Sequence, residues 1–331
     1  MKTHLLPAFS PAQIRDAADA ALDLLRGGYP VALPTETVYG LAAPAMNPDA
    51  VIRIFQVKDR PKFDPLIVHL PGIKWLDDVA DIPAVDRPLV EKLTRKFWPG
   101  PLTLVLPGKK VIPDLVTAGL GTVAVRISAH PVFKAVIDAF GQPLAAPSAN
   151  RFGRISPTTA RHVTDELNDK IHLVVDGGST THGIESTIIT LRENKIWILR
   201  SGPITAEELR PLASDVTIVN RIELPNAPGQ LKSHYAPATK MKLLRTGEAP
   251  KAKRGERTGL LAWCSPGEAK DFTKVEVLSR TGDPREAAAS LFSKLRILDS
   301  ADLDLIVAES VPEEGLGVAI MDRLRKAAGN G

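Results

Sequence analysis

The first helix predicted by the chain lies between two clear boundary signals. Ser10-Pro11 is typical of an N-cap followed by proline at the first helical position, and Gly27-Gly28 is typical of a helix end. Between them, apolar residues recur every three or four positions, which predicts an amphipathic helix. The short apolar run 29–33 that follows is interpreted as a buried strand.

Amphipathic helical patterns and short apolar runs continue to about residue 200. The predicted helices are 47–57, 87–97, 131–140 and 158–168, and the predicted strands are 66–70, 102–106, 122–127, 144–146, 171–175, 186–191 and 195–200. In the segment 34–45, Thr35, Glu36 and Thr37 follow a strand end, where hydroxyl groups can bind a polar ligand, and a turn is the alternative interpretation. Because several strands follow one another without a helix between them, we predict an α+β region with a mixed sheet.

The pattern changes near residues 223–238, where ELPNAPGQLKSHYAPA is too rich in proline and glycine for a regular element. Beyond it, strands and helices alternate, which predicts a small parallel α/β sheet. The predicted strands are 241–244, 260–264, 275–278 and 303–308, and the predicted helices are 284–298 and 314–327. We therefore expect a first domain over 1–215, a Pro-rich linker over 216–239 and a small α/β domain over 240–331.

Composition narrows the class of protein. With 331 residues, 44% hydrophobic and 24% charged, the chain is expected to form about two globular domains. No apolar run is long enough to cross a bilayer, and the first residues do not resemble a secretory signal. A single cysteine, Cys264, excludes disulfides within the chain and cysteine-based metal clusters. We therefore expect a cytoplasmic protein. The net charge of +4 is a mild excess that suits an anionic small molecule as well as a nucleic acid.

The first candidate for chemistry is the loop KDRPKFDPL, which joins a predicted helix to a predicted strand. Lys58 and Arg60 stand two residues apart and can converge on one anion, because Arg offers a planar fork and Lys a mobile point charge. A solvated surface loop is the other interpretation.

A second candidate is APSANRFGRISPTT, a polar loop between a predicted strand and a predicted helix, where anions often bind. Ser148, Asn150 and Ser156 offer hydroxyl and amide groups. A polar turn that caps the next helix is the alternative. Neither GxxxxGK[ST] nor GxGxxG occurs, so a nucleotide site of a standard kind is excluded.

Several other polar residues end or begin predicted strands. Arg126 and Arg200 end apolar strands, where a cation needs a partner. Each arginine either binds an anionic ligand or forms a structural salt bridge. His69 lies within the apolar run LIVHL and could be a core histidine, and Ser186 begins a strand. His182 and His234 have no second imidazole at metal-ligand spacing, so no metal site is expected. Together these residues favour a cleft of cations and hydroxyls in which one substrate attacks the phosphate of another.

The blocks PTETVYGLAAPA, KDRP with PLIVH, FWPGPLTLVL, TVAVRI, PSANRFGRISPT, STII and ILRSGPI occur in this order. Together they resemble the YrdC-like family, the threonylcarbamoyl-AMP synthases of tRNA modification, over about residues 10–210. HYAP and the α/β region after it resemble the long, two-domain form. The resemblance implies a twisted, mixed α/β sheet with a concave basic face and a smaller Rossmann-like domain.

The resemblance also implies an activity: L-threonine, bicarbonate and ATP give threonylcarbamoyl-AMP and pyrophosphate. The implied catalytic residues are Lys58 and Arg60. The implied ATP-binding residues are Lys58, Arg60, Asp64, Thr122, Ser148, Asn150, Ser156, Arg200, His234 and Tyr235. The implied L-threonine-binding residues are Thr35, Thr37, His69, Arg126, Ala146 and Ser186. Gln230 and Ser233 depart from the family's usual linker.

Cofactor and partners follow from the same resemblance. Mg²⁺ is expected to be carried by ATP. The expected partners are the small-molecule substrates and the proteins that transfer the threonylcarbamoyl group to tRNA, the t6A modification. Binding of tRNA itself is expected to be weak or indirect, and no membrane is expected. Three other functions stay open: RNA binding without catalysis, carbamoyl transfer in hydrogenase maturation, and ligand sensing. The carbamoyltransferases of hydrogenase maturation are longer and carry paired cysteines, whereas this chain has one cysteine, which argues against that function.

Overall fold

The structure is a computed structural model that describes residues 2–61, 64–219, 235–267 and 269–329. The chain forms two compact units. Unit 1 consists of Met1–Phe152, Pro157–Thr180 and Glu185–Gln230, and unit 2 consists of Gly153–Ser156, Thr181–Ile184 and Leu231–Gly331. Most of the linker expected over 216–239 lies outside the described residues, so the expected division into domain, linker and domain stays a prediction.

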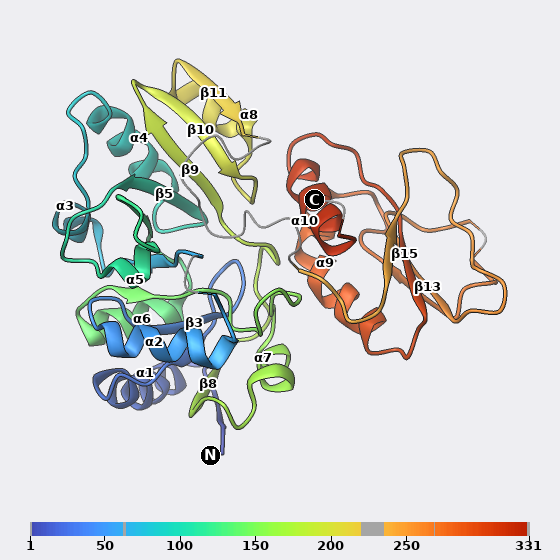
Figure 1. Ribbon diagram of the computed structural model, residues 1–331, viewed down its shortest axis with the longest axis horizontal. Coiled ribbons are helices and arrows are strands. Elements are labelled where there is room, and N and C mark those ends of the chain that lie inside the picture. Colours follow the sequence, from blue (N-terminus) through green and yellow to red (C-terminus); the bar gives the residue numbers. More distant parts are fainter. Residues whose placement is uncertain (1, 62–63, 220–234, 268, 330–331) are drawn as a thin grey trace. The chain divides into compact units, whose positions relative to one another are not determined.

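In the described part of unit 1, eleven strands form one sheet in the order β1-β8-β2-β3-β7-β4-β6-β5-β9-β10-β11 (Figure 1). The strands are β1 (His4–Pro7), β2 (Val31–Leu33), β3 (Gly40–Pro44), β4 (Ile67–His69), β5 (Leu102–Pro107), β6 (Thr122–Arg126), β7 (Leu144–Ala145), β8 (Leu173–Asp176), β9 (Thr187–Arg192), β10 (Lys195–Arg200) and β11 (Asp215–Ile218). Parallel pairs such as β4 with β6 stand beside antiparallel pairs such as β5 with β6. The predicted mixed α/β sheet is therefore confirmed.

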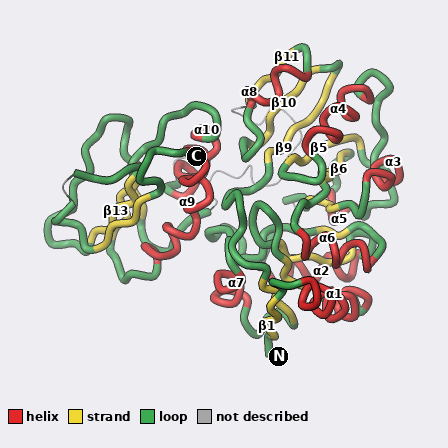
Figure 2. The backbone as a smooth tube through the Cα atoms, turned by 180° about the vertical axis from the view of Figure 1, so that it is seen from behind, coloured by secondary structure: helices red, strands yellow, loops and turns green. Residues whose placement is uncertain are grey.

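Helices surround this sheet, and Figure 2 shows α1, α2 and α6 (red) gathered near the N-terminal strand. The helices of unit 1 are α1 (Pro11–Arg26), α2 (Pro48–Lys58), α3 (Leu76–Val79), α4 (Arg87–Phe97), α5 (Asp114–Thr117), α6 (Pro131–Phe140), α7 (Ala160–Leu167) and α8 (Ala206–Leu209), with 3₁₀ turns η1 (Ile73–Trp75) and η2 (Arg210–Leu212). The predicted start of α1 is confirmed, since Ser10 and Gln13 form a capping box.

The sheet is covered on both faces, as its strand β3 demonstrates. Leu41 and Ala43 belong to the core cluster that includes residues of α2, α4 and α7. Ala42 belongs instead to the cluster that includes residues of α1 and α6. Since successive side chains of a strand point to opposite faces, both faces of β3 are buried under helices.

Three strands of unit 1 differ from the sequence-based prediction. β3 lies in the segment 34–45, for which a turn was one interpretation, and β1 was not predicted at all. β11 lies where the linker 216–239 was expected to begin. Every residue of β3 is buried, so its sequence Gly-Leu-Ala-Ala-Pro carries no alternation of polar and apolar positions that would identify a strand. β1 is only four residues long and pairs with β8, about 170 positions further along the chain.

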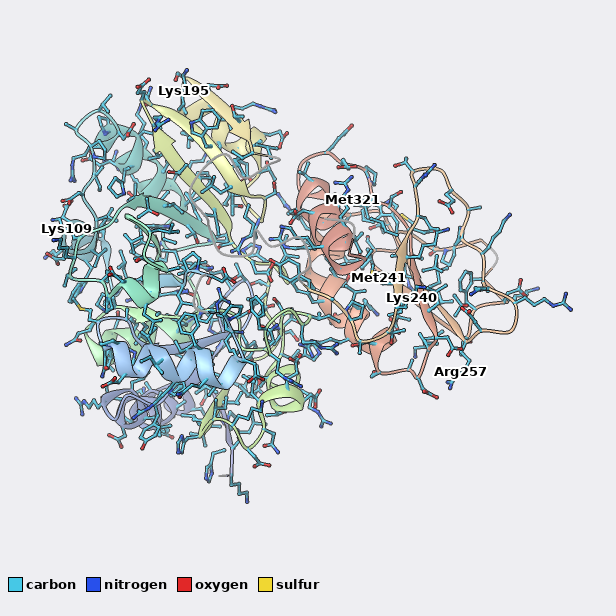
Figure 3. All side chains as sticks on the ribbon, viewed as in Figure 1. Lys109, Lys195, Lys240, Met241, Arg257 and Met321 are labelled. Atoms are coloured by element: carbon cyan, nitrogen blue, oxygen red, sulfur yellow. The ribbon has the colours of Figure 1, made fainter. Side chains whose placement is uncertain are left out.

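Unit 2 is a small parallel sheet, as predicted, with the strand order β12-β15-β13-β14. Its elements are β12 (Met241–Leu243), β13 (Thr258–Ala262), β14 (Lys274–Val277), β15 (Leu305–Ala308), α9 (Pro284–Asp299) and α10 (Gly317–Ala327). Met241 of β12 and Met321 of α10, both buried, are labelled in Figure 3. No helix in the described part of the chain combines the length and the apolarity that a membrane span needs.

Two short segments from the middle of the sequence belong to unit 2. Ala236 donates its backbone N–H to the carbonyl of Gly153 at 2.9 Å, and Arg154 forms an ion pair of 2.9 Å with Asp299 at the end of α9. Arg296 donates to the carbonyl of Ile155. The polar loop that follows β7 therefore begins in unit 1 and continues as part of unit 2.

Candidate functional site

The last residue of α2 is a lysine whose ammonium group points into unit 1. Lys58 is 1% exposed, and its Nζ donates to the carbonyl of Ser148 at 2.5 Å and to the carbonyl of Asn150. The side-chain Oδ1 of Asn150 lies 3.5 Å from the same Nζ. The structure thus brings the two polar sequence blocks together, although they are about 90 residues apart.

Burial dominates the electrostatics of this lysine. Removal from water lowers the pKa of Lys58 well below its ordinary value, and the neighbouring positive charge of Arg60 lowers this pKa further. Glu166 and Asp64 act in the opposite direction. A cation in these surroundings attracts an anionic ligand strongly, because little water screens the attraction.

Arg60 lies in the loop after α2, and its guanidinium group contacts this loop through Nε and Nη2. It forms an ion pair of 2.8 Å with Asp64 and donates to the carbonyls of Asp64 and Pro65 at 3.3 and 2.9 Å. The guanidinium carbon is 5.7 Å from the centre of the Phe152 ring. The interpretation of this loop as a solvated surface is wrong for Lys58 and Arg60, which are both buried.

A second cluster surrounds Arg126, the last residue of β6. Arg126 is 3% exposed, and it donates to Glu36 Oε1 through one terminal nitrogen and to Thr37 Oγ1 at 3.2 Å through the other. Glu36 Oε2 in turn accepts from Ser128 Oγ at 2.6 Å and from the backbone N–H of Ala129 at 3.1 Å. The salt bridge considered for Arg126 therefore exists, and its partner is Glu36.

The pKa of Glu36 reflects two opposing effects. Burial alone would raise this pKa, but the charge of Arg126 and the hydrogen bonds from Ser128 and Ala129 outweigh burial and lower it. Glu36 is therefore ionised at neutral pH. Sequence reasoning did not identify Glu36 or Ser128 as site residues. The available signal was an acidic residue between two threonines directly after a buried strand.

The two threonines beside Glu36 have different roles. Thr35 Oγ1 donates to the carbonyl of Val38 at 2.6 Å and accepts from the backbone N–H groups of Thr37 and Val38 at 3.1 and 3.2 Å. Thr35 therefore builds the turn between β2 and β3, whereas the Thr37 hydroxyl reaches Arg126.

His69 ends β4 at the position paired with Arg126 of β6. Its ring centre lies 4.5 Å from that of Phe133, and the residue is 2% exposed. Burial, and then the charge of Arg126, hold the pKa of His69 well below its ordinary value, so the ring is neutral. Among the described residues, neither His69 Nδ1 nor Arg126 Nε has a hydrogen-bond partner. Two buried polar atoms without partners, on neighbouring strand positions, fit a small polar ligand.

Arg200 and Ser186 form a third contact at the adjoining ends of β10 and β9. Arg200 donates through Nε to the Ser186 carbonyl and through a terminal nitrogen to its hydroxyl, both at 3.1 Å. The Ser186 hydroxyl is also 2.8 Å from Thr103 Oγ1 of β5. The structure therefore joins a residue expected to contact ATP to one expected to contact threonine.

The remaining expected site residues fall in different places. Ala146 follows β7 and donates its backbone N–H to the carbonyl of Ile67, and Thr122 is half-buried at the start of β6. Ser156 is buried in unit 2, where Tyr235 stacks on Phe292 with ring centres 5.5 Å apart. His234, with Gln230 and Ser233, lies outside the described residues. The described part of the chain has no group of three or more His, Cys, Asp or Glu side chains placed to hold a metal ion.

Two family models match the chain in succession. A model described as "Telomere recombination", for the Sua5–YciO–YrdC family, matches residues 23–202. A model described as "Threonylcarbamoyl-AMP synthase, C-terminal domain" matches residues 204–329. Together they account for both units of the structure.

Known proteins match over nearly the whole length. A threonylcarbamoyl-AMP synthase of Pyrococcus abyssi is 40% identical over 327 residues, covering 93% of each chain. One of Bacillus subtilis is 40% identical over 322 residues, covering 93% of this chain and 92% of its own. The crystal structure of P. abyssi Sua5 complexed with L-threonine superimposes with a TM-score of 0.88 at 39% identity, covering 99% of this chain and 98% of the other.

Proposed function

The chain belongs to the Sua5–YciO–YrdC family in its two-domain form, and we propose that it is an L-threonylcarbamoyladenylate synthase. It joins L-threonine, bicarbonate and ATP into threonylcarbamoyl-AMP and releases pyrophosphate, as a nucleotidyltransferase. The similarity to synthases over more than nine-tenths of both chains supports this activity.

The observation that carries the threonine site is the pair of partnerless atoms on β4 and β6. Arg126 Nε is a cationic donor, and His69 Nδ1 belongs to a neutral ring. An amino acid offers a carboxylate to Arg126 Nε and an amino group or hydroxyl to His69 Nδ1. L-Threonine is the ligand in the solved P. abyssi structure, which supports a threonine site in this chain. We assign Thr37, His69, Arg126, Ala146 and Ser186 to this site. Thr35 then acts through the turn it builds.

The ATP site is proposed around the cluster that joins α2 to the loop after β7. Lys58 and Arg60 supply positive charge for the triphosphate, and Asp64 holds Arg60 through an ion pair. Ser148 and Asn150 carry the carbonyls that anchor Lys58, so the cation is held against the proposed nucleotide loop. Thr122, Ser156, Arg200, His234 and Tyr235 complete the proposed set.

The chemistry follows from charge. The threonine amine attacks the carbon of bicarbonate and forms a C–N bond while a C–O bond breaks and water leaves; attack on carbon dioxide releases a proton instead. A carbamate oxygen then attacks the α-phosphorus of ATP while the bond from that phosphorus to pyrophosphate breaks. Both the carbamate and the triphosphate are anions, and they repel each other strongly where water is scarce. Lys58 and Arg60 offset that repulsion and stabilise the leaving pyrophosphate. The neutral His69 ring is suited to accept a hydrogen bond from the amine.

Mg²⁺ is proposed to arrive with ATP. Magnesium usually keeps several water ligands and is bound through substrate phosphates with one or two carboxylates. The described residues offer Asp64 near Arg60 but no larger acidic cluster, which fits a metal held chiefly by the nucleotide. It would add charge neutralisation on the phosphates.

The product's destination and the protein's location are proposed from the family. The threonylcarbamoyl group would pass to tRNAs that read codons beginning with A, through the proteins of t6A transfer, with tRNA bound weakly or indirectly. A cytoplasmic location stays a prediction from the sequence.

Mass spectrometry of the products from ATP, bicarbonate and L-threonine tests the proposed function, with L-serine in a parallel reaction. Threonylcarbamoyl-AMP and a matching amount of pyrophosphate are expected only when all three substrates are present. Salt-sensitive RNA binding without threonine-dependent ATP turnover would instead support the RNA-binding alternative.

A further inference from the structure

The two buried charges at the Arg126 end of the proposed threonine site cancel. Glu36 is 6% exposed and ionised, and Arg126, its ion-pair partner, is positive. His69 is neutral. His130, in the segment that begins α6, has a pKa lowered by burial, although Glu36 acts to raise it. Arg126 and Glu36 therefore form a pair with no net charge, whereas Arg200 is held at Ser186.

This balance decides which ligands can enter. A carboxylate that binds Arg126 must share the guanidinium with the Glu36 carboxylate, and two carboxylates close together in a buried site repel each other. The repulsion is offset when the same ligand carries an ammonium group. A zwitterion leaves the net charge unchanged, whereas a simple carboxylate or a phosphate leaves an uncompensated negative charge.

The hydrogen bonds show that Glu36 is fixed in this position. Its Oε1 accepts from Arg126, and its Oε2 accepts from Ser128 Oγ and from the Ala129 N–H. Arg126 is held on its other side by Thr37. Neither charge can turn away from an incoming ligand without breaking several buried hydrogen bonds.

We propose that Glu36 is the specificity-determining residue that makes the threonine site accept a zwitterionic amino acid and reject simple anions. The inference rests on the proposed function, because it takes Arg126 as the group that binds the threonine carboxylate. Rejection of anions matters in a site beside ATP and bicarbonate, since a lone buried arginine would bind either of them.

The test compares two ligands that differ in one group. Calorimetric titration measures L-threonine and 3-hydroxybutyrate, which is threonine without its amino group, against the wild-type full chain and Glu36→Gln. Glutamine keeps an acceptor for Arg126 but removes the charge. The wild type is expected to prefer threonine strongly, and the preference is expected to fall at least about tenfold in Glu36→Gln, with 3-hydroxybutyrate binding more tightly than to the wild type.

Two matched variants separate charge from structure. Glu36→Asp retains the charge and is expected to retain the preference. Glu91→Gln removes an exposed glutamate of α4 and is expected to change neither affinity. A purely structural role for Glu36 predicts that Glu36→Gln weakens both ligands by the same factor, and that result would overturn the inference. A wild type that binds no threonine would overturn the proposed function instead.

A wild-type measurement decides the matter if Glu36→Gln does not fold. Binding of 3-hydroxybutyrate should be accompanied by proton uptake, because protonation of Glu36 relieves the repulsion, whereas threonine binding should not require it. Titrations at pH 6 in buffers of different ionisation enthalpy measure this uptake. Equal affinity and equal proton uptake for the two ligands would contradict the inference.

Discussion

His69 and Arg126 are register partners on the neighbouring parallel strands β4 and β6. Both residues end their strands, and in each one buried nitrogen has no partner among the described residues. The charge of Arg126 also helps to keep the His69 ring neutral. A cationic donor and a neutral imidazole are thus held side by side by the sheet itself.

Arg126→Lys is expected to raise the KM for L-threonine about ten- to a hundredfold while the KM for ATP changes little. Lysine keeps the charge but loses the planar fork that contacts Glu36, Thr37 and a carboxylate together. Steady-state pyrophosphate release with each substrate varied in turn measures both constants. Arg95→Lys, an exposed residue of α4, is the matched control. Equal increases in both KM values would argue against a threonine-specific role.

Lys58→Ala and Arg60→Ala are each expected to reduce formation of the adenylate by about two orders of magnitude, the scale for loss of one charge-stabilising donor. In Lys58→Ala the carbonyls of Ser148 and Asn150 also lose their shared donor. Product formation under saturating substrates is the measurement. Lys74→Ala, exposed in η1, serves as the control. Near-normal pyrophosphate release would remove Lys58 and Arg60 from the mechanism.

His69 is expected to make the protein less stable as the pH falls. Its pKa is lowered in the folded state, so below about pH 6.5 the unfolded chain binds a proton that the folded protein does not. The free energy of unfolding therefore decreases on acidification, by at most about 1.4 kcal/mol per pH unit for this one group. The effect continues until the pH reaches the lowered pKa.

Urea denaturation of wild type and His69→Gln between pH 7.5 and 5 measures this contribution. The variant is expected to show a smaller loss of stability, because glutamine does not titrate. Glu36 affects the pH dependence of stability only at more acidic pH. In the unfolded chain its carboxylate takes up a proton near the ordinary pKa of 4.5, whereas in the folded protein this pKa is lowered. Identical pH dependence in the two proteins would show that the pKa of His69 is not lowered by folding.

Gly202→Ala is expected to destabilise unit 1 by about 1–3 kcal/mol, as overpacking does. An added Cβ would lie 2.5 Å from the backbone nitrogen of Thr187 and 2.6 Å from the carbonyl oxygen of Glu185. The backbone on either side of Ser186 would have to move, so threonine affinity should fall too. Thermal unfolding and threonine titration measure the two effects.

Gly72→Ala is the matched control for Gly202→Ala. Its added Cβ meets no atom within 4 Å, and its φ of −168° is extended backbone that alanine adopts readily. No loss of stability is expected. A melting temperature for Gly202→Ala as high as that of Gly72→Ala would show that the chain around Ser186 yields easily.

Much of the fold could be predicted from local sequence. α6 has the bounds that its proline start and Gly141 end indicate, and α4 matches the predicted 87–97. β3 could not be recognised, because all of its residues are buried and none is polar. The order of the strands was also unpredictable, since β7 pairs with β3 and β4, which lie far from it in the chain.

The ordered motifs by themselves determined the family, the mixed sheet and most of the candidate site, because each short block keeps its chemistry wherever the chain carries it. Only the tertiary structure decided the partners. Glu36 meets Arg126, and Lys58 meets Ser148 and Asn150, across about 90 positions of sequence. Such pairings depend on strand order and register, which arise from long-range packing of the sheet and leave no trace in local periodicity.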